Sequence, residues 1–229
     1  MKPVIKKRLT ALDIYKTSSM PERYATSGIK LGGYFDIETT DFNPQFGFIL
    51  TISVVIRDMT KKNRIFKKLI YRVKQKEILE AALKKKKNIA DKRILTEFLR
   101  DLKKYKIDAL FGWYSNGRHK FDMPFVRSRA LLLGIEELIP SHKTMRYIDL
   151  WNVAKNILKS QGYSLDKIGQ ITGATSSKTK VEGEIWWKAH YGDKESLDYV
   201  QRHNEKDTMR TLQIHKKIER MANIPLSYI

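Results

Sequence analysis

The stretch Tyr34-Phe35-Asp36-Ile37-Glu38-Thr39-Thr40 ends an apolar run with two acidic side chains. Two glycines and several apolar residues precede it, which predicts a buried strand. Because side chains alternate between the two faces of a strand, Asp36 and Glu38 point the same way. Two adjacent carboxylates repel each other and are costly to bury, so this pair indicates a bound cation, usually a divalent metal ion. The alternative is a strand end whose acids are simply solvated.

The composition of the chain favours one domain that binds a polyanion. The chain has 229 residues, of which 41% are hydrophobic, and this length supports one domain with a sizeable core. Its formal net charge is +20 and its pI is about 9.9, which points first to nucleic acid as the partner. A solvated lysine-rich surface is the alternative, because net charge also serves solubility.

The chain contains no cysteine, which excludes disulfides, thiolate zinc sites and cysteine nucleophiles. No apolar run approaches the roughly 18 residues that a membrane-spanning helix needs. The basic N-terminus, residues 1–8, is not followed by the long apolar run of a secretory signal. We therefore expect an intracellular, cytoplasmic protein that does not enter a membrane.

Beyond the opening strand, the hydrophobic pattern predicts two further strands and then an alternation of helices and strands. Asp91 and Asp149 are expected to open helices, and Gly134 and Gly173 to end them. The expected strands are residues 29–40, 46–56, 66–73, 107–113 and 145–148, and the expected helices are residues 76–83, 91–105, 122–133, 149–158, 164–171, 185–190 and 194–222.

This order of elements predicts an α/β domain with a mixed central sheet flanked by helices. A three-stranded antiparallel meander is expected to continue into two parallel strands. The domain should cover residues 29–229, and residues 1–28 should form a basic N-terminal extension. That extension either contacts nucleic acid or is a solvated arm.

Two further acids lie where they can approach the strand pair. Asp122 follows the fourth expected strand at the start of a helix, where it either caps backbone N–H groups or points toward the first two acids. His203 and Asp207 are four residues apart on the last helix, so they share one helix face. They are either a carboxylate and an imidazole of the same site or an ordinary surface pair.

These motifs resemble the proofreading exonuclease domain of family B DNA polymerases over about residues 30 to 215. The stretch Phe35-Asp36-Ile37-Glu38-Thr39 is similar to its first motif. The second motif is similar to Tyr114-x-Asn116 followed by Phe121-Asp122-x-Pro124-Phe125 and Arg129. The third is similar to Leu197-x-Tyr199 followed by His203-Asn204-Glu205-Lys206-Asp207. The segment between them is similar to Gly162-Tyr163-Ser164-Leu165-Asp166-x-Ile168 followed by Trp186-x-x-x-His190-Tyr191-Gly192-Asp193.

The resemblance implies a stand-alone DEDD-superfamily 3′-to-5′ exonuclease of ribonuclease H-like fold, without a polymerase domain. This chain departs from the family at one position. Family B domains usually have Tyr four residues before the last Asp, and here that position is His203. The DEDD subgroup that uses His normally carries it five residues before that Asp. Tyr199 lies eight residues before Asp207, about 12 Å along a helix at about 1.5 Å per residue, which is too far to replace His203 easily.

The resemblance also implies a two-metal hydrolysis of phosphodiester bonds by Mg²⁺ or Mn²⁺. Asp36 would bridge both ions, Glu38 and Asp207 would hold the ion that activates water, and Asp122 would support the other. His203 would accept the proton of the attacking water, since its unperturbed pKa of about 6.5 suits neutral pH.

Substrate contacts would come from the backbone after the acid strand, from an asparagine and from aromatic rings that stack on terminal bases. The expected contact residues are Ile37, Thr39, Thr40, Phe42, Asn116 and Phe121, with Trp113 as a further candidate ring.

The favoured substrate is the 3′ end of single-stranded DNA. Trimming of RNA ends is one alternative, because no residue distinguishes a deoxyribose from a ribose pocket. A nucleic-acid-binding scaffold on an inactive nuclease fold is another, although the presence of all four carboxylates argues against it. A replication or repair protein is a candidate partner.

Overall fold

The computed structural model describes residues 29–60, 64–84, 89–115, 120–176 and 181–222. Five strands form one mixed sheet in the order β3-β2-β1-β4-β5. β1 pairs antiparallel with β2, which pairs antiparallel with β3, and β4 lies parallel to both β1 and β5. The predicted mixed sheet is therefore confirmed. The strands are β1 (Leu31–Thr39), β2 (Ile49–Asp58), β3 (Arg64–Arg72), β4 (Ala109–Gly112) and β5 (Arg146–Asp149).

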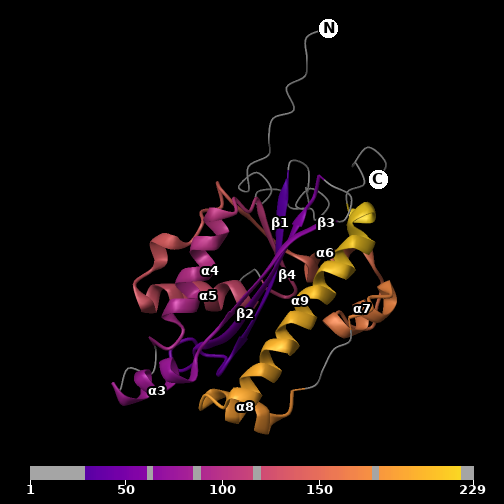
Figure 1. Ribbon diagram of the computed structural model, residues 1–229. Helices are drawn as coiled ribbons and strands as arrows, with labels where there is room; N and C mark the ends of the chain where they lie inside the picture. Colours follow the sequence, from indigo (N-terminus) through magenta and orange to yellow (C-terminus); the bar gives the residue numbers. More distant parts are fainter. Residues whose placement is uncertain (1–28, 61–63, 85–88, 116–119, 177–180, 223–229) are drawn as a thin grey trace.

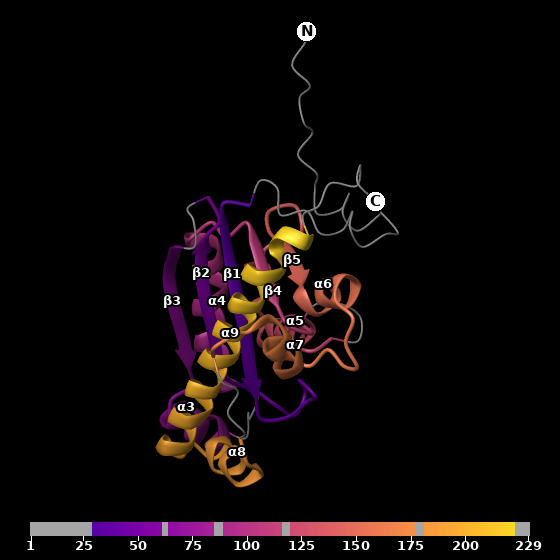
Figure 2. The same ribbon diagram turned by 90° about the vertical axis from the view of Figure 1, so that its right-hand side faces the viewer.

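Helices cover both faces of this sheet, with α4 and α5 on one side and α6, α7 and α9 on the other (Figure 1). The long helix α9 crosses the face of the sheet, and α8 lies at its N-terminal end in both views (Figures 1 and 2). The helical elements are α3 (Gln75–Leu83), α4 (Lys92–Lys104), α5 (Asp122–Leu133), η2 (Glu136–Leu138), α6 (Leu150–Ile157), α7 (Leu165–Thr172), α8 (Gly183–His190) and α9 (Lys194–Ala222).

Two hydrophobic clusters form, one on each face of the sheet, because the residues of β1 alternate between them. Phe35 packs in the first cluster, where its ring lies 6.1 Å from that of Phe98 on α4. Tyr34 packs in the second cluster, with its ring stacked 5.0 Å from Phe111 of β4. The central strand is thus buried on both faces, which fixes the position of the acids at its end.

Most predicted boundaries lie within a few residues of the observed ones. Gly134 and Gly173 end α5 and α7 with positive φ angles of 62° and 68°, a region that glycine enters without steric cost. Asp149 opens α6 as predicted, because its side chain accepts a hydrogen bond from the backbone N–H of Trp151. The second strand begins at Ile49, three residues later than predicted.

The predicted capping role of Asp91 is wrong. Asp91 occupies the position before α4, but its side chain makes no capping hydrogen bond. It instead accepts hydrogen bonds from the backbone N–H of Ile49 and from Nε and Nη2 of Arg129, at 3.0, 3.0 and 2.6 Å. Both side chains of this ion pair are fully buried, so the carboxylate binds a guanidinium instead of a helix end.

No helix in the described part of the chain combines the length and the apolar character needed to cross a membrane. The expected basic extension, residues 1–28, lies outside the described residues.

Candidate active site

Strand β1 carries Asp36 and Glu38 onto the face of the sheet that α9 covers. The pleat places these two carboxylates on that face, while Phe35 packs on the opposite face. The register between β1 and β2 shifts between Glu38 and Thr39, at the end of the strand. Such bulges are common beside active sites, where they re-aim a side chain.

Helix α9 brings His203 and Asp207 to the same place. Both side chains are nearly buried, and their four-residue spacing puts them on one helix face. His203 Nε2 lies 3.4 Å from Glu38 Oε1 and 3.7 Å from Asp207 Oδ2. The imidazole therefore lies between a carboxylate of the sheet and a carboxylate of the helix.

Asn204 is a further residue of the site. It belongs to the third motif, but no role was predicted for it. Its side chain is completely buried, and its amide donates a 2.7 Å hydrogen bond to Asp36 Oδ2. Asn204 lies on α9, next to His203, and its buried amide orients the carboxylate of Asp36 on β1. Its position next to His203 in the third motif was the available signal.

Asp122 is the first residue of α5 and is 5% exposed. Within the described residues the Asp122 carboxyl accepts no hydrogen bond from a backbone N–H of α5, so the capping alternative does not hold. Burial raises the pKa of the Asp122 carboxyl well above its usual range, and the charges of Asp36 and Asp149 raise it further. Among the described residues, Oδ2 of this carboxyl has no hydrogen-bond partner. Asp122 therefore lies near other carboxylates, and no hydrogen bond within the described residues offsets the burial of its Oδ2.

The chemistry of this set fits an oxygen-preferring divalent ion, since three chain segments contribute carboxylates and one of them is buried and uncompensated. Within the described residues, however, no group of three or more His, Asp or Glu side chains could hold a metal ion as it stands. The Asn204 amide engages Asp36, and the His203 ring lies between two of the acids. A metal would therefore have to move these side chains.

A pocket of about 490 Å³ opens beside the acids, between the end of β1 and helix α8. The rings of Phe42 and Phe121 meet edge to face in its wall, with centroids 5.6 Å apart. Phe42 is 87% exposed, so its ring is available to a ligand. The lining residues are Ile37, Glu38, Thr39, Thr40, Asp41, Phe42, Phe121 and Trp186.

Five of the predicted contact residues line this pocket, and Asn116 lies outside the described residues. Trp113 does not line the pocket. It packs against the second core cluster and donates from Nε1 to the carbonyl of Tyr163 at 3.1 Å. Trp186 was not predicted as a contact, because a tryptophan in a short helix next to a hydrophobic core is usually part of that core.

Behind Asp122 lies a lysine between two aromatic rings. Lys120 Nζ lies 3.7 Å from the ring centroid of Tyr114, 3.4 Å from that of Trp151 and 4.0 Å from Asp149 Oδ2. Asp149 Oδ1 accepts hydrogen bonds from the backbone N–H groups of Tyr114 and Trp151, both at 3.0 Å. This arrangement fixes the segment that leads into α5, and Lys120 balances part of the negative charge near Asp122.

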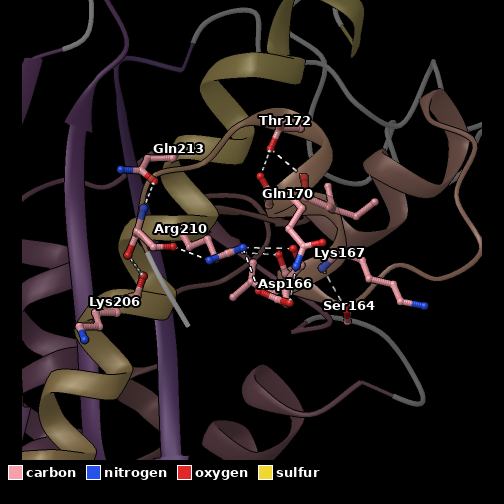
Figure 3. Close-up of polar contacts among 12 residues, drawn as sticks. Ser164, Asp166, Lys167, Gln170, Thr172, Lys206, Arg210 and Gln213 are labelled. Atoms are coloured by element: carbon pink, nitrogen blue, oxygen red, sulfur yellow. Dashed lines mark hydrogen bonds and ion pairs between the residues drawn. The ribbon is translucent and has the colours of Figure 1, made fainter. Parts of the chain in front are cut away.

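A second cation, Arg210, holds α9 against α7 (Figure 3). Arg210 lies about one turn after Asp207 and is nearly buried. It donates to the carbonyl of Leu165 at 3.3 Å, to the carbonyl and Oδ1 of Asp166 at 3.1 and 2.9 Å, and to the carbonyl of Ser176. A Cβ on Gly169 would lie 2.2 Å from Arg210 Nε, so glycine is needed there for the guanidinium to fit.

Residues 33–219 match the RNase_H_2 family model, which is described as part of the RNase H superfamily. The match includes all of α5 and most of β1 and α9, the three elements that carry the acids. A comparison with curated proteins finds no match. The family supports a ribonuclease H-like nuclease domain and implies nucleic acid as its ligand. Because the match covers most of the chain and the sheet has the predicted topology, this chain belongs to the RNase H superfamily.

Proposed function

We propose that the chain is a metal-dependent 3′-to-5′ exonuclease of the DEDD type, which hydrolyses phosphodiester bonds of single-stranded DNA. The observation that carries the proposal is the convergence of β1, the start of α5 and the middle of α9 at one edge of the sheet. Asp36, Glu38, Asp122 and Asp207 come from these three elements, and His203 lies between two of them.

The four carboxylates would hold two divalent ions, Mg²⁺ or Mn²⁺, which when bound neutralise charge on the phosphate and lower the pKa of water. Before ions bind, the Asp122 carboxyl keeps its proton more readily than an ordinary aspartate. Because ion binding needs the ionised carboxylate, the ion competes with this proton. The Asn204 amide restricts the orientation of Asp36.

His203 is the group we assign as general base. Its Nε2 lies between Glu38 and Asp207, so the ring can take up a proton where two negative charges stabilise it. Tyr199, the other candidate on α9, is one turn before His203, farther from these acids.

The pocket beside the acids supports action on strand ends. Its aromatic walls, Phe42 and Phe121, suit the faces of an unpaired base, and Glu38 links the pocket to the acid site. A paired base would hide its faces from these rings. We therefore assign the pocket to the terminal nucleotide, with Thr39, Thr40 and the backbone of Ile37 as contacts.

The direct test is a cleavage assay on a single strand labelled at its 5′ end, made once as DNA and once as RNA. Each is incubated with Mg²⁺, Mn²⁺ or EDTA and with wild type or Asp36→Ala. A metal-dependent ladder that shortens from the 3′ end and is lost in Asp36→Ala supports the proposal. A circular single strand should stay intact, since it has no end.

Other outcomes of the same assay overturn specific parts of the proposal. Faster cleavage of RNA would make the protein an exoribonuclease of the same chemistry. Tight binding without cleavage under any metal condition would make it a nucleic-acid-binding scaffold. A replication or repair partner is a further proposal, which co-purification on a primer–template substrate would test.

A further inference from the structure

Two exposed aromatic side chains lie on α8 and at its end. Trp187 is 64% exposed and Tyr191 is 58% exposed. Their rings meet edge to face, with centroids 5.1 Å apart. Apolar rings that gather at the surface mark a binding site more often than a single exposed ring does.

This aromatic pair is connected to the wall of the pocket. Trp186, the residue before Trp187, lines the pocket itself. On the other side, the ring of His190 is stacked on Trp187 at 6.1 Å and lies 5.7 Å from the ring of Phe48. Phe48 exchanges backbone and side-chain hydrogen bonds of 3.0 Å with Thr40, another lining residue of the pocket. Ring contacts therefore connect Tyr191 and Trp187 through His190 to Phe48, which is hydrogen-bonded to a residue of the pocket wall.

Among the described residues on and beside α8, acids outnumber lysines. The acids are Glu182, Glu184, Asp193 and Glu195, and the lysines are Lys188 and Lys194. Lys188 on α8 forms a 2.7 Å ion pair with Glu184, and both side chains are exposed. Lys194, at the start of α9, is flanked by Asp193 and Glu195. Attraction of phosphates is therefore a weak source of affinity here, and the rings themselves are the main feature that a ligand can use.

We propose that Trp187 and Tyr191 form a second subsite, which stacks an upstream nucleobase of the strand whose terminal nucleotide occupies the pocket. The inference rests on the proposed function, since it assigns the pocket to a strand end. Unpaired bases are the ligand class that fits, because every base has a face that can stack on an aromatic ring and a duplex hides those faces. The formal net charge of +20 belongs to the whole chain and favours nucleic acid as the ligand of the protein, whereas the contact at this subsite comes from the rings.

The test is binding of labelled single strands, measured by fluorescence anisotropy in an Asp36→Ala background so that no strand is cut. The probes are a dinucleotide, which reaches only the pocket, and a decanucleotide, which also reaches α8. The double variant Trp187→Ala/Tyr191→Ala should bind the decanucleotide about tenfold more weakly, as expected for a lost stacking contact, and the dinucleotide as before. The factor by which this variant loses decanucleotide affinity should be the same at low and at high salt.

Two further variants control for folding and for general loss of aromatic surface. Trp187→Phe/Tyr191→Phe keeps both rings and should retain most of the decanucleotide affinity. Phe66→Ala removes a ring that is 52% exposed on β3 and should leave both affinities unchanged. Unchanged decanucleotide binding by the double alanine variant overturns the inference and turns the pair into a candidate protein contact. An equal loss for both probes also overturns it, because the effect would then lie in the pocket.

Failure of the inference and failure of the proposed function give different results. If the wild type cuts 3′ ends and the double alanine variant binds like its parent, the exonuclease stands and the subsite falls. If the wild type cuts nothing but the length-dependent loss of binding is observed, the subsite stands on a protein that binds strands without cutting them.

Discussion

The Asn204 amide donates a 2.7 Å hydrogen bond to Asp36 Oδ2, although the two residues lie 168 positions apart in the chain. This contact joins the strand that carries the first two acids to the helix that carries the last one. The Asn204 side chain is completely buried, so packing holds the amide that orients the carboxylate. The arrangement of the acids therefore depends on how α9 packs against β1.

Asn204→Ala should lower the rate of strand cleavage about ten- to hundredfold, the usual effect of losing a partner that orients a metal ligand. Asn204→Asp should lower it more, since it places another negative charge beside Asp36. Steady-state kinetics on a labelled strand would measure both. Gln201→Ala is the matched control, because Gln201 lies on the same helix but bonds to Glu205. Equal rates for Asn204→Ala and wild type would show that the amide has no orienting role.

His203→Ala should lower the cleavage rate about 10²- to 10⁴-fold, the range expected for loss of a general base. Binding of the strand should change little, because His203 does not itself line the pocket and meets it only through Glu38. Single-turnover rates together with anisotropy would separate the two effects. Tyr199→Phe should keep the wild-type rate. The reverse pattern would assign the base to Tyr199 and make His203 a structural residue.

Asp122→Asn should stabilise the ion-free protein while abolishing cleavage. The pKa of Asp122 is raised in the folded protein, so the fold binds a proton that the unfolded chain releases near pH 4. Stability is therefore lost as the pH rises from that value toward the folded pKa, and an amide at this position avoids the loss. Thermal unfolding in EDTA should give a Tm several degrees higher for the variant at neutral pH, with a smaller difference in acid. A Tm difference that does not depend on pH would contradict this assignment.

Local patterns predict the fold and the positions of the acids, because these depend on short-range rules. The alternation of β1 places Asp36 and Glu38 on one face, and the helical spacing of α9 does the same for His203 and Asp207. The partners of Asp91 could not be predicted in this way. An aspartate before a helix fits a cap. Only the tertiary packing of α4 against α5 brings the buried guanidinium of Arg129 to it.

The same limit applies to the surroundings of the site. In the sequence, nothing distinguishes Lys120 from the many other lysines. Its position between the rings of Tyr114 and Trp151, which follow β4 and β5, depends on the fold. The sequence around Trp186 predicts a core residue. In the structure, its side chain lines the pocket together with residues that follow β1. Such contacts depend on which ends of helices and strands lie next to each other in the fold. The local spacing of hydrophobic residues does not specify this.

Arg129→Met should lower the free energy of unfolding by about 3–5 kcal/mol, because it leaves the buried Asp91 carboxylate without its partner. It also removes the 3.0 Å bond from Arg129 Nη1 to the carbonyl of Pro44, in the loop that carries Phe42. Urea unfolding would measure the loss. Arg93→Met is the control, since Arg93 pairs with Glu77 while about one third exposed, and it should cost only about 1 kcal/mol. Similar costs for the two variants would show that the buried pair has no special role.

Tyr34 and His215 form a 2.5 Å hydrogen bond between β1 and α9, about two turns beyond Asp207. Burial, and then the charge of Arg57, lowers the pKa of His215 to about 3. The unfolded chain binds the same proton near pH 6.5, so acid favours unfolding. The stability that neutral His215 contributes is complete above about pH 6.5 and is lost as the pH falls toward 3, by as much as about 5 kcal/mol.

His215→Gln should therefore flatten the decline of stability between pH 6.5 and 4, because glutamine can bond to Tyr34 but cannot take up a proton. Urea unfolding at several pH values would compare the variant with wild type. Arg57 and Glu219 remain in both proteins with their bonds of 2.8 and 3.0 Å, so their contribution cancels in the difference. Parallel pH profiles for the two proteins would mean that other groups cause the acid sensitivity and that the folded protein does not lower the pKa of His215.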